Sequence, residues 1–154
     1  MKPRIYIDTS VIGGYYDEEF KEATRALFER LETKEVVFIV SDLLELELIN
    51  APQKVRELLT KFPAAQFEFV SLTEEVTILA DSYIKEKVVG KTSIEDCRHI
   101  AMATICRADV LASWNFKHIV NLDRIRGYNS VNLRSGYQLL EIRSPKDLIH
   151  YEND

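Results

Sequence analysis

Short apolar segments alternate with longer amphipathic segments along the chain, and this alternation restricts the fold more than any other feature of the sequence. The expected strands are residues 4–7, 36–40, 67–70, 109–113 and 139–142. The expected helices are residues 19–33, 41–48, a segment that begins at Pro52, 76–89 and 93–108. Because short apolar strands joined by helices are typical of buried parallel sheets, we expect an α/β fold with a central, mostly parallel sheet covered by helices on both faces.

The size and composition of the chain favour one domain. The chain has 154 residues, of which 46% are apolar and 29% charged, so it can bury a core of its own but not a second one. We therefore expect a single domain over residues 1–154. The apolar segments are shorter than the ~18 residues that cross a bilayer, so we expect no membrane span and no secretory signal.

The two cysteines also bear on the setting of the protein. Cys97 and Cys106 fall in one expected helix, which separates them by about 13 Å along its axis. They cannot form a disulfide with each other, and we expect a reducing, cytoplasmic environment.

Asp8 follows the first expected strand directly and is itself followed by Thr9 and Ser10. All three residue types cap helices and turns well, which is one interpretation. The other is a metal or phosphoryl site, because ligands of such sheets bind at the carboxyl ends of the strands. The strand pattern alone leaves both open.

Two further places carry acids that can reach the same edge of the sheet. Glu45 and Glu47 follow the second strand on one helix and point in opposite directions, so we expect only one of them to be functional. Asp96 and His99 share a helix face beside small apolar residues that must pack on the sheet, and a buried acid needs a partner. A histidine in such a place is usually structural, so His99 is left out of the catalytic set.

Three carboxylates from Asp8, Glu47 and Asp96 would repel one another without a cation between them. Oxygen ligands favour a hard divalent ion, so we expect Mg²⁺ or Mn²⁺. Zinc is not expected, because the histidines and cysteines show no zinc-ligand spacing. They are His99, His118, His150, Cys97 and Cys106. The sequence also lacks the motifs of nucleophile elbows and phosphate-binding loops.

Four segments together resemble PIN domains. They are Ile5-Tyr6-Ile7-Asp8-Thr9-Ser10-Val11-Ile12, residues 40–48, Asp96-Cys97-Arg98-His99-Ile100-Ala101-Met102-Ala103, and residues 108–121. The resemblance implies a three-layer α/β/α PIN-like fold and an acidic Mg²⁺ or Mn²⁺ site that hydrolyses RNA phosphodiester bonds. Many small members are VapC-type toxins of toxin–antitoxin pairs, so it also implies a protein antitoxin and a homodimer.

The same resemblance assigns roles to single residues. Asp8, Glu47 and Asp96 match the catalytic, metal-binding acids of the family, and Glu47 matches better than Glu45. Asn115 stands where a fourth acid is usual, so we expect a neutral oxygen ligand there and one negative charge fewer. An alternative follows from this departure: a PIN-like RNA- or protein-binding module with weak catalysis.

Other polar residues are candidates for contacts around the site. Thr9, Ser10 and Ser113 are expected to bind waters or phosphate oxygens, or only to cap strand ends. Although the net charge of −5 argues against a nucleic-acid partner, basic and aromatic residues gather in residues 114–143. Lys117, Arg124 and Arg126 are therefore expected to bind RNA, unless the basic residues form only a solvated face.

Overall fold

The central element is a five-stranded sheet in which every pair of neighbouring strands is parallel. The structure is a computed structural model and describes residues 1–149; His150 lies outside them. In the order β3-β2-β1-β4-β5 the strands are Phe67–Val70, Val37–Ser41, Arg4–Ile7, Val110–Ala112 and Ile142–Arg143. The expected strands are all present, although β4 is shorter than predicted and β5 shares only Ile142 with the expected range 139–142.

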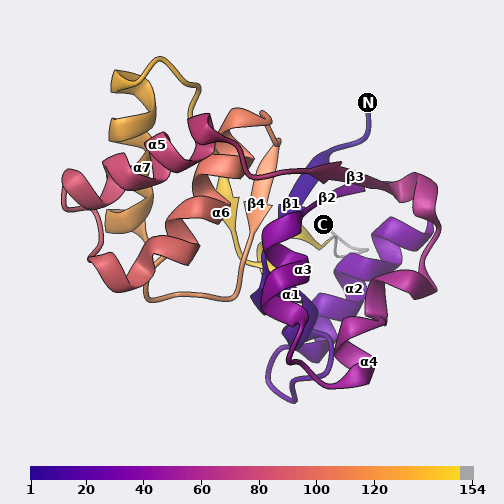
Figure 1. Ribbon diagram of the computed structural model, residues 1–154. Coiled ribbons are helices and arrows are strands. Elements are labelled where there is room, and N and C mark those ends of the chain that lie inside the picture. Colours follow the sequence, from indigo (N-terminus) through magenta and orange to yellow (C-terminus); the bar gives the residue numbers. More distant parts are fainter. Residues whose placement is uncertain (150–154) are drawn as a thin grey trace.

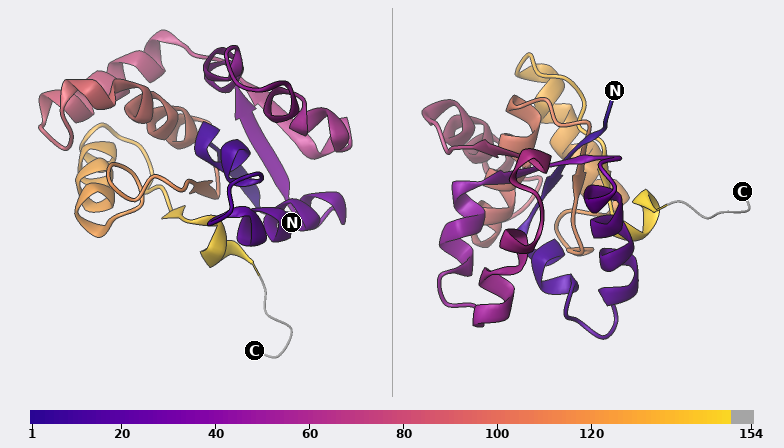
Figure 2. Two further views of the ribbon diagram at one scale, coloured as in Figure 1. Left: turned by 90° about the horizontal axis from the view of Figure 1, so that it is seen from below. Right: turned by 90° about the vertical axis from the view of Figure 1, so that its right-hand side faces the viewer.

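Helices cover both faces of the sheet, which confirms the three-layer α/β/α architecture (Figures 1 and 2). One layer holds α1 (Thr9–Gly14), α2 (Lys21–Glu32), α3 (Asp42–Leu48) and α4 (Gln53–Arg56). The other holds α5 (Glu74–Lys85), α6 (Ile94–Ile105) and α7 (Leu122–Arg134). Short 3₁₀ turns are Leu58–Lys61, Ala64–Gln66, Lys91–Ser93 and Pro145–Leu148.

Alternating side chains of each strand feed two separate cores. In β1, Ile5 and Ile7 pack into the core under α2 and α3, while Tyr6 points into the core under α5, α6 and α7. All three side chains are essentially inaccessible to solvent. This two-fold alternation is the reason why a strand can be apolar throughout and still serve both layers.

Three helices end earlier than the sequence predicts, and one of them is α6, which ends at Ile105 rather than at Ala108. The segment after Pro52 forms only α4 and a 3₁₀ turn, and the turn ends at Lys61 because Pro63 restricts Phe62 to an extended conformation. Helix α5 ends at Lys85 rather than at Gly90, because Lys87 adopts a left-handed conformation with φ 63°. The amides of Lys87 and Val88 then bond back to the last turn, in a Schellman motif.

Two helices were not predicted at all. Helix α1 follows β1 directly, and α7 occupies part of the basic stretch that we interpreted only by its charge. Gly127 lets α7 pack closely, since a Cβ atom there would lie 2.7 Å from a methyl group of Val88. Within the described chain no helix has both the length and the apolar composition required to cross a membrane.

Candidate functional site

Strand order reverses at the pair β1–β4, because the chain moves from β1 to β2 and β3 and then crosses back to β4. Such a reversal leaves a crevice at the carboxyl ends of the strands, where parallel sheets bind their ligands. Asp8 follows β1 and Ser113 follows β4, so both lie at this point of the sheet. The predicted site is therefore at the place that the topology favours.

Asp8 is a buried carboxylate that accepts three hydrogen bonds. Its Oδ1 accepts from the Ser10 hydroxyl at 2.6 Å and from the Val11 amide at 3.3 Å, and its Oδ2 accepts from the Ser113 hydroxyl at 2.6 Å. Asp8 thus caps α1, which confirms the first of the two interpretations, while the metal or phosphoryl site remains a prediction. Burial raises the pKa of Asp8, although the two hydroxyl groups oppose the shift.

Glu47 extends from α3 toward the same edge. Its Oε1 lies 2.5 Å from Nε2 of His99, and its Oε2 accepts from the Thr9 hydroxyl at 2.7 Å. Burial favours a higher pKa for Glu47, but the hydrogen bond and charge of His99, helped by Thr9, outweigh burial and lower it. The hydroxyl groups of Thr9, Ser10 and Ser113 each donate a hydrogen bond to a carboxylate of the site, and their contacts with waters or phosphate oxygens stay a prediction.

His99 joins the site to the interior of the sheet. Its Nδ1 lies 2.7 Å from the hydroxyl oxygen of Tyr6, which in turn bonds to the hydroxyl of Ser41 at 3.0 Å. His99 is 2% exposed, so it is the buried, satisfied residue that we expected, but it also holds Glu47 in place. Tyr6 was not among the candidates predicted from the sequence, although a tyrosine in a buried strand signals a polar group that needs a partner.

Asp96 lies in the first turn of α6 and is half-buried. Its Oδ2 accepts a hydrogen bond of 3.2 Å from Nδ2 of Asn115. Burial raises the pKa of Asp96, and the negative charge of Asp8 raises it further. The two aspartates are thus close enough to repel each other.

The electrostatics fit a divalent cation. Among residues 1–149, no lysine or arginine forms an ion pair with Asp8 or Asp96, and the acidic side chains offer only oxygen atoms. In the same part of the chain no three histidine, cysteine or acidic side chains are assembled closely enough to hold a metal ion. Mg²⁺ does not need such a cage, because it commonly binds one or two carboxylates and retains several waters. Asp8 and Asp96 fit that pattern, with Glu47 farther out.

Asn115 lies beside Asp96, but its orientation differs from the expected one. Its Oδ1 accepts hydrogen bonds from the backbone amides of Lys117 at 3.2 Å and His118 at 3.0 Å. Its amide nitrogen, not its oxygen, faces Asp96. The side-chain oxygen that we expected to be a neutral ligand therefore already accepts hydrogen bonds from the loop after Asn115.

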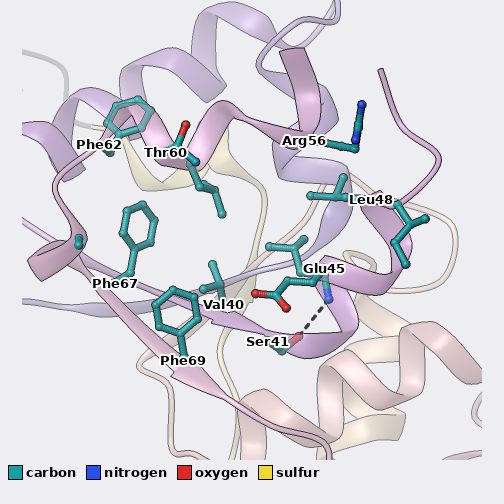
Figure 3. A pocket seen from close by; sticks show the side chains of 13 residues that line it. Val40, Ser41, Glu45, Leu48, Arg56, Thr60, Phe62, Phe67 and Phe69 are labelled. Carbon is teal, nitrogen blue, oxygen red and sulfur yellow. Dashed lines mark hydrogen bonds between the residues drawn. The ribbon is translucent and has the colours of Figure 1, made fainter. Parts of the chain in front are cut away.

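Glu45 lies apart from the acidic site. It lines an apolar cavity of about 580 Å³ between α3, the following turns and β3 (Figure 3). The other lining residues are Val40, Ser41, Leu44, Leu48, Ile49, Arg56, Leu59, Thr60, Phe62, Ala64, Phe67 and Phe69. The two glutamates thus point to different sides of α3, as their spacing predicts.

The predicted RNA-binding residues have different surroundings. Lys117 and Arg126 are exposed, whereas Arg124 donates a hydrogen bond to the carbonyl of Val88 and is partly buried. Trp114 is a core residue that stacks on Phe20, with the ring centroids 4.2 Å apart. The free basic side chains are therefore fewer than the sequence pattern suggests.

Comparisons with known proteins support the fold. No family model and no curated protein matches this sequence. The crystal structure of VapBC2 from Rickettsia felis, bound to a DNA fragment from their promoter, contains a similar chain, with a TM-score of 0.59 and 15% sequence identity. The match covers 92% of this chain and 98% of that chain. The likeness shows that the chain has a PIN-like fold, as the resemblance implied.

Proposed function

We propose that this protein is a ribonuclease that hydrolyses RNA phosphodiester bonds with Mg²⁺ or Mn²⁺, and that it is the toxin of a toxin–antitoxin pair. The second half of the proposal rests on the similarity to a chain of VapBC2. It implies a protein antitoxin as partner, and we further propose that the toxin is a homodimer.

One observation supports the first half most strongly. Asp8 is 4% exposed, lies at the reversal of strand order beside Asp96, and has no cationic side chain paired with it among the described residues. Two adjacent, desolvated carboxylates are unfavourable unless protons or a cation compensate them. A divalent ion would compensate the negative charge of the two carboxylates. An ion bound at this place could also contact a phosphate.

A bound divalent ion would polarise a phosphoryl oxygen and lower the pKa of a coordinated water. The side chains of the protein have separate tasks. Asp8 and Asp96 would hold the ion, and Ser10 and Ser113 keep the Asp8 carboxylate in one orientation. Glu47, fixed by Thr9 and His99, would orient the attacking water.

The experiment is cleavage of a labelled single-stranded RNA by the purified protein. We expect cleavage with Mg²⁺ or Mn²⁺, none with excess chelator, and recovery when the ion is restored. RNA binding without cleavage in any of these ions would instead support the binding-module alternative and contradict the proposed activity.

A further inference from the structure

The oxygens of the three acidic side chains differ in whether protein groups already occupy them. Hydrogen bonds reach both oxygens of Asp8, both of Glu47 and Oδ2 of Asp96. Among the described residues none reaches Oδ1 of Asp96. This oxygen is therefore the carboxylate oxygen most free to meet a ligand.

The side chain of Asn115 decides which oxygen of Asp96 is left free. Its amide can bond to Asp96 only through Nδ2, because its Oδ1 accepts from the backbone amides of Lys117 and His118. A flipped amide would point its NH₂ group at these two N–H donors, so the assignment of nitrogen and oxygen is not ambiguous here.

The backbone of Asn115 is fixed as well. Its N–H donates to the hydroxyl oxygen of Ser113 at 3.0 Å, and the same hydroxyl donates to Asp8 at 2.6 Å. Ser113 thus connects Asn115 to Asp8, while the Asn115 side chain contacts Asp96. The residue bridges the two acids without being an acid itself.

Resting on the proposed metal-dependent function, we propose that Asn115 is a positioning residue and not a metal ligand: its amide occupies Oδ2 of Asp96 and presents Oδ1 to the cation. A carboxylate held at one oxygen has one orientation rather than several. The amide also places a partial positive charge beside Asp96 and adds no negative charge to a site that already holds Asp8.

Exchanging the two side chains separates this role from that of a ligand. The double variant Asp96→Asn/Asn115→Asp keeps the net charge, the amide and the carboxylate, but it reverses which residue is the donor. If Asn115 only positions Asp96, one oxygen of the new carboxylate at position 115 accepts from the amides of Lys117 and His118 and the other accepts from the amide introduced at position 96, so neither is free. If residues 96 and 115 are equivalent ligands, the exchange preserves the site.

The first measurement is Mn²⁺ binding by calorimetry to the wild type, the two single variants and the exchange variant. We expect the exchange variant to bind Mn²⁺ at least ~10-fold more weakly than the wild type, as does Asp96→Asn alone. Wild-type affinity in the exchange variant would overturn the proposal. Leu122→Glu is the control for added charge, since Leu122 is exposed in the first turn of α7, directly after the same loop.

The second measurement needs no metal. Asn115→Asp alone sets two carboxylates against each other, so we expect its unfolding midpoint in chelator to fall below that of the wild type. The exchange restores a donor–acceptor pair. Introducing Asp96→Asn should therefore raise the unfolding midpoint more in the Asn115→Asp background than in the wild type. Simple additivity of the two single changes would show that the pair is not coupled and would contradict the proposal.

The two measurements also separate the proposal from the function on which it rests. A wild type that binds no Mn²⁺ would refute the metal-dependent function and, with it, the presentation of Oδ1. The unfolding midpoints of the four proteins in chelator would still decide whether Asn115 holds Asp96.

Discussion

The hydroxyl of Ser113 donates a hydrogen bond of 2.6 Å to Oδ2 of Asp8 and so joins the end of β4 to the end of β1. The two strands are neighbours in the sheet, with Ile7 paired to Ala112. Neutral hydroxyl groups thus hold the buried Asp8 carboxylate without removing its charge. A cation can stabilise this carboxylate without first displacing a lysine or arginine.

Asp8→Asn should stabilise the metal-free protein and abolish its stabilisation by Mn²⁺. Asparagine still caps α1, but it removes the cost of a desolvated charge. The wild type should gain about 2.7 kcal/mol in free energy of unfolding at a Mn²⁺ concentration 100 times its Kd. Thermal unfolding with and without Mn²⁺ measures both effects. Equal stabilisation of wild type and variant by Mn²⁺ would remove Asp8 from the site.

The stability of the metal-free protein should depend on pH through Asp8 and Asp96. Since the folded state raises both pKa values above 3.8, it binds more protons than the unfolded state in the interval above that value. The contribution of these two carboxyl groups to the free energy of unfolding is therefore fully present below pH 3.8 and is lost as the pH rises through the raised pKa values. Denaturant titrations should show Asp8→Asn gaining stability relative to the wild type over this interval. A difference that does not change with pH would contradict the raised pKa values.

Tyr6→Phe should destabilise the protein by about 1–3 kcal/mol, because it leaves buried polar atoms of His99 and Ser41 without their partner. Tyr137→Phe is the matched control, since that hydroxyl bonds to Glu75 at the surface. Urea unfolding of both variants provides the comparison. If Tyr6→Phe lowers the free energy of unfolding no more than Tyr137→Phe does, the series of hydrogen bonds from Glu47 to Ser41 has no role in stability.

Most of this arrangement could be predicted from the sequence because it follows from periodicity. Apolar strands that end in polar residues locate Asp8 and Ser113, and helical spacing separates Glu45 from Glu47. Helix α7 could not be predicted in this way, because Leu122 and Leu133 are exposed while Asn132 is buried. Only Ile125, Tyr128 and Val131 mark its face toward the core, and the two exposed leucines obscure that pattern.

The orientation of Asn115 could not be predicted either. It depends on where the backbone amides of Lys117 and His118 point, and residue type alone carries no information on this loop geometry. The resemblance to PIN domains correctly indicated that Asn115 lies near Asp96, but not which atom of the amide faces it.

Basic residues near the site should fall into two groups in an RNA-binding assay. Lys117→Ala with Arg126→Ala should weaken binding and reduce the salt dependence by roughly 0.7 in slope for each phosphate contact that is lost. Arg124→Ala should instead lower stability, because its side chain bonds to the carbonyl of Val88. Filter binding at several salt concentrations tests the first effect and thermal unfolding the second. An unchanged salt slope in the double variant would show that Lys117 and Arg126 are only a solvated surface.

Cleavage of single-stranded RNA by two matched variants of α6 tests the central claim most directly. Asp96→Asn and Glu95→Gln each remove one negative charge from adjacent positions of the same helix turn, but Glu95 pairs with Arg98 at the surface. We expect Mn²⁺-dependent cleavage by the wild type and by Glu95→Gln, and a loss of at least ~10-fold in Asp96→Asn. Equal cleavage by the two variants, or cleavage by the wild type that persists in excess chelator, would contradict a metal-dependent ribonuclease centred on Asp96.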